Sequence, residues 1–575
     1  MSHETGISRA QFLRAATALA TVGLGGNTAM AAQPRTPRPA RARRPNILLV
    51  VTDQQQSFAD LPRALPLPAQ ERLLARGTGF TNHHVNTTPC GPSRSVLYTG
   101  RHTQQTGVFF NPNMAPHPEL AKTVPTIGHR LRQYGYHTAY KGKWHLSLLG
   151  NHSERALVQA DRSDALEPYG FSDFNFDGDH SGHSWSGYRQ DRAVAADACA
   201  LLQRLKHGAD EGQPWFLAVN FVNPHDIMFF DATGEQERTR LMPGLIAPLL
   251  PAPADPFFQR TWDFDLPRSL LEDDLSTKPW AQRDEVERND CIYGLLPRED
   301  LRAWRAFRDY YFNCIRHMDE QLELLLDGLS ATGQDQDTIV VFTSDHGERA
   351  GAHGLRQKGL SIYKENLRVP LIIAHPDAPG GRTTDALSSA VDLVPTLLGL
   401  AGVSPEELSE RHADLPGHDL SAVATDPKAG TARDKAGILF NYEVAGGWDT
   451  GDLKRRLGAV RNPPTAPLPP PSLDYRVLFR GVHDGRYKFA RYFAPSQHHT
   501  PRTWEQLTAH NDLELYDTRS DPDELVNLAA RPEAHRDLLL RLNQQTNRLV
   551  AAEVGVDDGA SLPGPTERYN QLVLS

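Results

Sequence analysis

The sequence predicts an α/β protein with a large doubly wound mixed sheet flanked by helices, followed by a smaller C-terminal subdomain of antiparallel sheet plus helix. Three observations support this fold class. Over most of the chain, apolar runs of strand length alternate with segments of helical periodicity. Several of these runs end in polar clusters, as strands do when their carboxyl ends line a site. Near the C-terminus, short strand-like runs separated by turn residues precede a helix.

The clearest strand comprises residues 46–51, a continuous apolar run that is typical of a strand buried on both faces. Because both faces of such a strand need cover, this run also predicts helices on the two sides of the sheet. Comparable runs predict further strands at 137–140, 215–221, 338–343 and 369–374.

Periodicity and stop signals mark the helices between these strands. Residues 69–76 are expected to form a helix that ends at Gly77. The strongest pattern lies between residues 301 and 325, where apolar side chains recur at spacings of three and four and form one helix face. In the C-terminal subdomain we expect strands at 476–482, 486–492 and 513–516, and then a helix at 533–551.

The chain divides by composition into five parts. Residues 1–31 combine a charged start, a mild apolar stretch and the small-residue motif Ala29-Met30-Ala31, which together indicate a secretory signal and a periplasmic or secreted protein. The segment resembles a twin-arginine signal, except that Ala10 takes the place of the second arginine; a disordered N-terminal arm is the alternative. The remaining parts are a Pro/Arg-rich linker (32–45), a main domain (46–440), a Pro-rich loop (441–475) and the C-terminal subdomain (476–575).

The composition excludes several classes of protein. The chain has 61 Lys and Arg against 70 Asp and Glu, a formal net charge of −9, which argues against nucleic acid as the main partner. With 39% hydrophobic and 23% charged residues, it is neither disordered nor collagen-like. Its four scattered cysteines exclude a disulfide framework and a zinc-ligand pattern. Beyond the N-terminal segment no stretch is apolar enough to cross a bilayer, so we expect no stable membrane insertion.

Two polar clusters follow predicted strands, and each offers a carboxylate beside a second ligand. Asp53 and Gln54 follow the first strand, whereas Asp345 and His346 follow a later one. Brought together, the two pairs would hold a divalent cation, and their oxygen ligands favour calcium, magnesium or manganese. Taken singly, each Asp is better explained as a helix cap or turn former.

A cysteine and several cationic side chains complete the candidate site. Cys90 lies just before a helix expected to begin near residue 92, where a helix N-terminus would lower the thiol pKa and favour a nucleophile. The alternative is a buried structural cysteine. Near other strand ends lie side chains that together suit a tetrahedral anion, although each alone would be an ordinary surface residue. They are Lys143, His145, His225 and Lys358.

These motifs resemble the sulfatase family. Residues 90–94, Cys-Gly-Pro-Ser-Arg, followed by Thr99 and Gly100, match the signature of that family. The resemblance extends from Asn46 to the last predicted helix. The other polar clusters occur in the order that the family shows, around Asp53, Lys143, His225, Asp345 and Lys358.

The resemblance implies an alkaline-phosphatase-like fold and hydrolysis of a sulfate ester to an alcohol and inorganic sulfate. In similar proteins a maturation enzyme oxidises the signature cysteine, here Cys90, to formylglycine. One hydroxyl of the aldehyde hydrate attacks sulfur and expels the alcohol, and loss of a proton from the other hydroxyl then releases sulfate. The main domain at 46–440 is accordingly expected to be catalytic, with 441–475 as an active-site loop.

The resemblance also implies roles for individual residues. Lys143 and Lys358 would bind the sulfate oxygens, and Arg94 would hold the formylglycine. His145 would be the base for the second hydroxyl, and His225 the acid for the leaving oxygen. The implied metal ligands are Asp53, Gln54, Cys90, Asp345 and His346. Many relatives carry Asp in place of Gln54 and Asn in place of His346; we expect Ca²⁺ first, then Mn²⁺ or Mg²⁺.

Two other functions stay open at this stage. A phosphonate monoester or phosphodiester hydrolase of the same superfamily would share the formylglycine. A non-catalytic glycan-binding relative would lack catalytic groups that this sequence retains. The expected substrate is a small-molecule or glycan sulfate ester, a carbohydrate or aryl sulfate. Its pocket walls are expected from residues 226–300 and 442–474, whose tryptophans either stack on the substrate or pack within the loops.

Overall fold

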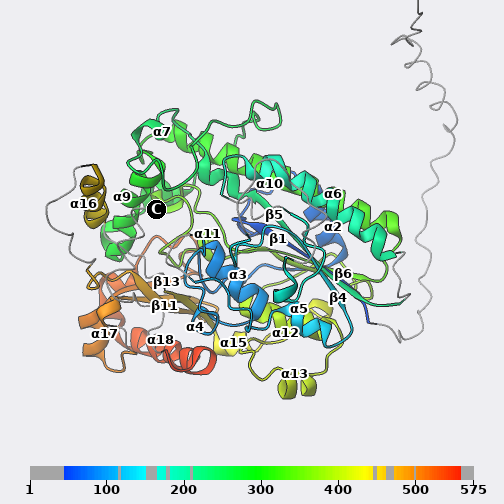
Figure 1. The fold of residues 1–575 in the computed structure, drawn as a ribbon. Helices are drawn as coiled ribbons and strands as arrows, with labels where there is room; N and C mark the ends of the chain where they lie inside the picture. The colour runs from blue at the N-terminus through cyan, green and yellow to red at the C-terminus, as the bar shows by residue number, and fades with distance from the viewer. Residues whose placement is uncertain are drawn as a thin grey trace, which may run out of the picture. The chain divides into compact units, whose positions relative to one another are not determined.

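The computed structural model of the chain describes residues 44–113, 118–149, 165–176, 182–206, 212–443, 450–461, 472–497 and 500–557. The expected signal peptide lies outside these residues, as do nearly all of the linker and much of the Pro-rich loop. Helices enclose a large sheet, and a second sheet lies near the C-terminal end of the chain (Figure 1). None of the helices in the described parts combines the length and apolar character required to span a membrane.

The large sheet has seven strands in the order β4-β5-β1-β6-β7-β2-β8. Strands β4, β5, β1 and β6 are parallel, whereas β7 is antiparallel to both β6 and β2. The predicted mixed sheet is therefore confirmed. Its strands are β1 Asn46–Asp53, β2 Thr78–Phe80, β4 His137–Gly142, β5 Trp215–Pro224, β6 Thr338–Ser344, β7 Leu371–Ala374 and β8 Arg382–Thr384. A separate parallel pair is formed by β3 His83–His84 and β9 Ser388–Ser389.

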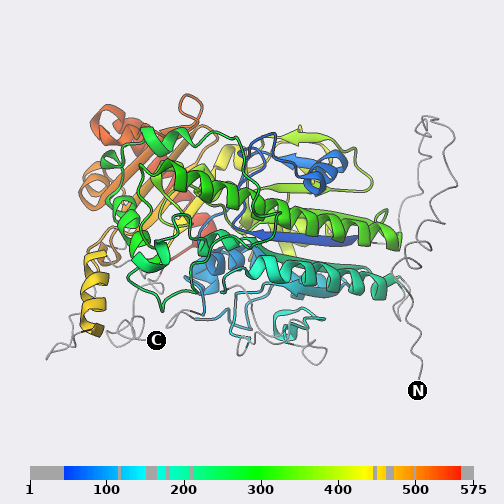
Figure 2. The same ribbon diagram turned by 90° about the horizontal axis from the view of Figure 1, so that it is seen from above.

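Helices cover both faces of this sheet. One layer holds α2 Pro68–Arg76, α6 Ser186–Lys206 and α10 Leu301–Thr332, and α6 and α10 run side by side along the strands (Figure 2). The other layer holds α3 Cys90–Thr99, α5 Ile127–Arg132 and α12 Leu393–Leu400 (Figure 1). Because helices lie on both sides, every residue of β1 and β5 is buried, which explains their continuous apolar runs.

Shorter helices complete the main domain and its surroundings. They are α4 Thr103–Thr106, α7 Gln236–Thr239, α8 Arg268–Glu272, α11 Lys364–Leu367, α13 Pro405–Arg411, α14 Ser421–Thr425, α15 Arg433–Ala436 and α16 Thr450–Arg461. Among the short 3₁₀ turns are η3 His225–Phe229, which begins with one of the predicted site residues, and η5 Ala352–Gly354.

The second sheet is antiparallel, in the order β10-β11-β12-β13. Its elements are β10 Ile438–Tyr442, β11 Leu478–His483, β12 Tyr487–Phe493, β13 Asn511–Asp517, α17 Trp504–His510 and α18 Arg536–Leu549. One face packs on α18 through residues such as Val482 and Phe489, and the other packs on the main domain through Phe479 and Tyr492. The boundary expected at residue 440 falls inside β10, which pairs with β11.

Helix α9, Trp280–Tyr293, lies within residues 226–300, the segment expected to supply walls of the substrate pocket. Its buried positions include polar side chains, among them Gln282, Asp284 and Glu285, so no apolar stripe marks it. Tertiary contacts satisfy these groups instead: Arg349 Nη1 donates to Glu285 Oε2 at 2.5 Å, and Gln282 Nε2 donates to Glu514 Oε1 at 2.8 Å.

Candidate active site

The two predicted carboxylate clusters meet at the carboxyl edge of the large sheet. Strands β1 and β6 are parallel neighbours, with Thr52 opposite Ser344, so Asp53 and Asp345 leave the sheet side by side. Asp53, Cys90, Asp345 and His346 are all buried, and each presents a ligand atom within 4.8 Å of the others. Register alone therefore brings together two carboxylates that are far apart in the sequence.

Cys90 is the first residue of α3, and its side chain points into this cluster. Its Sγ lies 3.1 Å from His346 Nε2 and 3.7 Å from Asp53 Oδ1. The backbone N–H of the next residue, Gly91, donates to Asn111 Oδ1 at 2.9 Å. Burial and Asp53 raise the pKa of the thiol, but Lys143, Lys358 and His346 lower it, and the net pKa lies well below its usual value.

Arg94, one helical turn further along α3, bridges the two carboxylates. Its Nε donates to Asp345 Oδ2 at 2.8 Å, and its Nη2 donates to Asp53 Oδ2 at 3.4 Å. The remaining donor, Nη1, bonds Asn220 Oδ1 at 3.1 Å and the Lys143 carbonyl at 3.0 Å. The guanidinium is fully buried. These hydrogen bonds hold the carboxylates of Asp53 and Asp345 in position.

The electrostatics of the cluster fit a divalent cation. Burial and the neighbouring Asp53 carboxylate raise the pKa of Asp345 to about 7. Burial lowers the pKa of His346, but Asp345 and Cys90 raise it by a larger amount. The resulting pKa of His346 is about 8. Burial raises the pKa of Asp53, yet Lys143, His225 and His346 outweigh it and hold this pKa well below its usual value. Two carboxylates packed this closely repel each other, and a cation between them would relieve that repulsion.

The two predicted sulfate-binding lysines reach the cluster from different loops. Lys143 Nζ lies 2.5 Å from Asp53 Oδ2. Lys358 Nζ donates to Gln54 Oε1 at 2.6 Å, so this oxygen of the predicted metal ligand is already an acceptor. The amide nitrogen of Gln54 donates to Gln357 Oε1 at 3.1 Å and to Glu348. These contacts fix which end of the Gln54 amide faces Lys358.

The two predicted acid–base histidines follow the parallel neighbours β4 and β5, at one edge of the sheet. His225 begins η3, directly after β5, and is 4% exposed. Among the described residues its Nδ1 has no hydrogen-bond partner. Burial, Lys358 and Lys143 lower its pKa to about 3, although Asp53 opposes them. His145 Nε2 lies 3.1 Å from Asn113 Oδ1, and its backbone adopts a left-handed φ of 58°.

Sequence reasoning did not identify several residues that hold this site in place. Asp226 accepts from the N–H groups of Gly187 and Tyr188 at 2.9 and 2.8 Å, which ties the His225 turn to the start of α6. Asn220 accepts from Tyr98 Oη at 2.6 Å as well as from Arg94. Only Asp226 carried a local signal, its position next to His225. The others become neighbours only through the fold.

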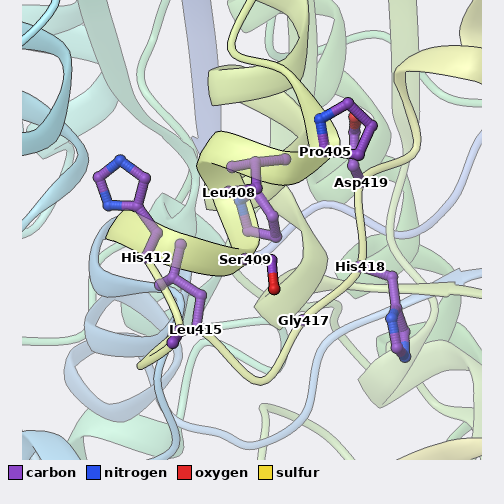
Figure 3. Close-up of a pocket in the computed structure, with 10 residues that line it drawn as sticks. Pro405, Leu408, Ser409, His412, Leu415, Gly417, His418 and Asp419 are labelled. Carbon is purple, nitrogen blue, oxygen red and sulfur yellow. The ribbon is translucent and has the colours of Figure 1, made fainter.

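A separate cavity of about 440 Å³ lies between α13 and the segment that follows it (Figure 3). Leu408, Ser409, His412 and His418 are among the residues that line it. None of the predicted site residues contributes to this lining, so the cavity does not belong to the cluster around Cys90.

Comparison with known proteins agrees with the geometry. The sequence model described as Sulfatase matches residues 45–403. An ulvan-active sulfatase of Formosa agariphila is 26% identical over 92% of this chain and 85% of its own length. An N-acetylglucosamine-6-O-sulfatase of Bacteroides thetaiotaomicron is 24% identical over 89% of this chain and 88% of its own length.

Solved structures share the fold at lower sequence identity. The phosphonate monoester hydrolase of Agrobacterium radiobacter superposes with a TM-score of 0.58 at 21% identity, covering 88% of this chain and 96% of that one. Because the family model spans most of the chain, and because the motif residues of that family converge at one sheet edge, the assignment is clear. The chain belongs to the sulfatase family of the alkaline-phosphatase-like superfamily and is a sulfuric ester hydrolase.

Proposed function

We propose that this enzyme hydrolyses a carbohydrate or aryl sulfate with a formylglycine formed from Cys90 and one divalent cation. The observation that carries the proposal is the position of Cys90 Sγ, 3.1 Å from His346 Nε2 in a buried cluster that also contains Asp53 and Asp345. A structural cysteine needs no such surroundings. A nucleophile that contacts both a cation and an anionic substrate needs carboxylates and an imidazole around it, as Cys90 has.

The cation would be held by Asp53, Asp345, His346 and the formylglycine formed from Cys90, with Gln54 as a further ligand. Oxygen atoms make up most of this set and favour Ca²⁺, with Mn²⁺ or Mg²⁺ as alternatives. When bound, the cation supplies Lewis acidity toward the sulfate oxygen and the hydrated aldehyde. Arg94 keeps the two carboxylates in place and offsets part of their charge.

Lys143 and Lys358 bind the sulfate oxygens. Each ammonium group is anchored by an acceptor of the cluster, Asp53 Oδ2 for Lys143 and Gln54 Oε1 for Lys358. Positive groups held in position in a buried site stabilise the negative charge that develops as the ester bond breaks.

Burial, Lys358 and Lys143 lower the pKa of His225 in the free site, and the negative charge of the bound sulfate ester offsets the two lysines, so that His225 can donate a proton to the leaving oxygen. His145 accepts the proton whose loss releases sulfate. His225 lies at the carboxyl end of β5, on the sheet edge where substrates bind in doubly wound folds. The contact with Asn113 fixes the orientation of the His145 ring, two residues after Lys143 in the chain. Acid–base catalysis of this kind contributes about 10²–10⁴-fold in rate.

Names of two relatives point to carbohydrate sulfates as the substrate class: the protein from Formosa agariphila is ulvan-active, and the one from Bacteroides thetaiotaomicron is an N-acetylglucosamine-6-O-sulfatase. The N-terminal signal predicted from the sequence indicates export to the periplasm or the medium. A formylglycine-generating maturation enzyme is the partner that this mechanism requires, acting on residues 90–94.

A phosphonate monoester or phosphodiester hydrolase is the second candidate. It is favoured by the superposition on the Agrobacterium radiobacter hydrolase, which concerns the fold alone. Parallel assays with a sulfate monoester and a phosphate diester decide between the two. Higher kcat/KM for the diester would overturn the sulfatase assignment of the reaction.

The proposal is tested at residue 90. In protein produced together with a maturation system, peptide mass spectrometry should show loss of sulfur at Cys90, and Cys90→Ala should abolish turnover without unfolding the chain. Cys291→Ala is a matched control because Cys291 is another buried cysteine, 3% exposed, outside the cluster. Unmodified cysteine in fully active protein would contradict the mechanism.

A further inference from the structure

A second imidazole–carboxylate cluster occurs at the junction between the main domain and the antiparallel sheet. His353, Glu365 and Glu524 each present a ligand atom within 4.8 Å of the others, and none of them belongs to the cluster around Cys90. His353 lies in η5 and Glu365 in α11, whereas Glu524 follows β13. The cluster therefore joins two segments that are far apart in the sequence.

His353 is oriented as metal-binding histidines are. Its Nδ1 lies 2.8 Å from Asp273 Oδ2, so Nδ1 donates and the opposite nitrogen, Nε2, carries the lone pair. The ring stacks on Tyr363, with 3.5 Å between ring centroids and 8° between ring planes. The backbone of His353 has a left-handed φ of 60°, which directs this buried side chain inward.

The acceptor atom that faces the cluster is unpartnered. His353 is 0% exposed, and within the described parts of the chain its Nε2 has no hydrogen-bond partner. Glu365 is 13% exposed, but its Oε2 atom is buried and has no hydrogen-bond partner there; it lies 3.9 Å from Nε2, beyond hydrogen-bonding distance. Two buried lone-pair atoms facing each other are costly unless a cation or a proton lies between them.

Neighbouring lysines do not fill this gap. Lys278 pairs with Asp273 at 3.1 Å, and Lys488 pairs with Glu524 Oε1 at 2.6 Å. Lys364 Nζ bonds Asp523 at 3.0 Å and approaches Glu365 Oε1 only to 3.9 Å. Burial raises the pKa of Glu365, and the opposing effect of Lys364 does not cancel it. Glu365 is thus the carboxylate of the cluster that lacks a close cationic partner.

We propose that His353, Glu365 and Glu524 bind a second divalent cation of the zinc class, distinct from the cation of the active site. One imidazole nitrogen and two carboxylate oxygens suit Zn²⁺, with water as a fourth ligand. Zinc bonds of about 2.1 Å at tetrahedral angles place nitrogen and oxygen about 3.4 Å apart, so small rotations close the observed separation of 3.9 Å.

The cation would fasten the segment that carries Lys358 to the C-terminal sheet. Lys358 lies between His353 and Glu365 in the sequence, and Glu524 also accepts from the backbone N–H of Lys364 at 2.8 Å. The proposed role is structural, and the site does not depend on the reaction proposed for Cys90.

The test measures metal rather than activity. Full-length protein is stripped with a chelator, loaded with Zn²⁺ and desalted, and its zinc content is measured. Asp345→Asn should lose the active-site ion and retain the second one. Glu365→Gln and Glu524→Gln should each lose one ion relative to the unsubstituted protein. The exposed Glu323, replaced by Gln, controls for the change of charge and should leave the zinc content unaltered.

A crystal of the unsubstituted, zinc-loaded protein gives the independent measurement. An anomalous peak at the zinc edge is expected beside His353 Nε2, within bonding distance of both glutamates. A map without that peak, in which Nε2 contacts protein atoms alone, would overturn the proposal and leave an ion-pair network in its place. Unchanged zinc content in both glutamate variants would overturn it equally.

Discussion

The two sheets of this enzyme differ in where neighbouring strands end. In the large sheet, the parallel neighbours β1 and β6 end at the same edge, so Asp53 and Asp345 lie side by side there. In the antiparallel sheet, successive strands end at opposite edges, and side chains alternate between α18 and the main domain. The difference shows why the reactive groups gather on the first sheet, whereas the second serves as a support.

The support acts on the segment that carries Lys358. Lys488 Nζ donates to the Ile362 carbonyl at 3.2 Å, and Tyr492 packs in one buried apolar cluster with Leu360. Both residues lie on β12. Changes at the parallel edge should therefore reduce turnover, and changes in the antiparallel sheet should mainly reduce stability.

The largest effect is expected from Asp345→Asn at the parallel edge. The substitution removes a charged ligand and also an acceptor of Arg94. Losing several kcal/mol of charge stabilisation corresponds to a decrease in kcat/KM of about 10³-fold or more. Steady-state assays with measured metal content check this, and the exposed Asp377→Asn is the control. Near-normal kcat/KM would show that the parallel edge does not carry the chemistry.

A smaller effect that depends on the substrate is expected from His225→Ala. Protonation matters for a departing sugar alkoxide but hardly for a nitrophenolate, which is stable without a proton. We expect a loss of about 10²–10⁴-fold with a sugar or alkyl sulfate and a much smaller loss with a nitrophenyl sulfate. The ratio of the two kcat/KM losses is the measurement. Equal losses for both leaving groups would assign His225 a purely structural role.

The smallest effect concerns the stability of the antiparallel sheet. Burial and Lys488 lower the pKa of His483, on β11, to about 4, so the unfolded chain binds the proton more readily between pH 6.5 and 4. The free energy of unfolding therefore falls as the pH falls through this window, by about 1.4 kcal/mol per pH unit for one such group.

In His483→Asn, urea unfolding should show a correspondingly weaker dependence on pH in this window, because the asparagine cannot take up a proton. Its amide can still donate to the Tyr487 carbonyl, which lies 3.3 Å from His483 Nδ1. Above pH 7 the two proteins should show the same dependence, which serves as the internal control. Identical slopes at low pH would remove His483 as a source of acid lability.

Local sequence was sufficient to predict the main strands and helices of the large sheet and its layers. A strand that is buried on both faces, such as β1, is a continuous apolar run in the sequence. A helix that is buried along one face, such as α10, has apolar residues at spacings of three and four. Both patterns can be recognised within a short stretch of chain. The motif around Cys90 likewise lies within a few residues, so the family could be identified before any contact was known.

Long-range contacts decided the rest. The buried face of α9 is polar and acquires its partners only from Arg349 and the distant β13, so no periodicity marked it in the sequence. The two carboxylates shared by Arg94 are far apart in the sequence, and Glu524 meets His353 across the junction of the two sheets. Such groups become neighbours through strand register and sheet docking, and a single sequence records neither.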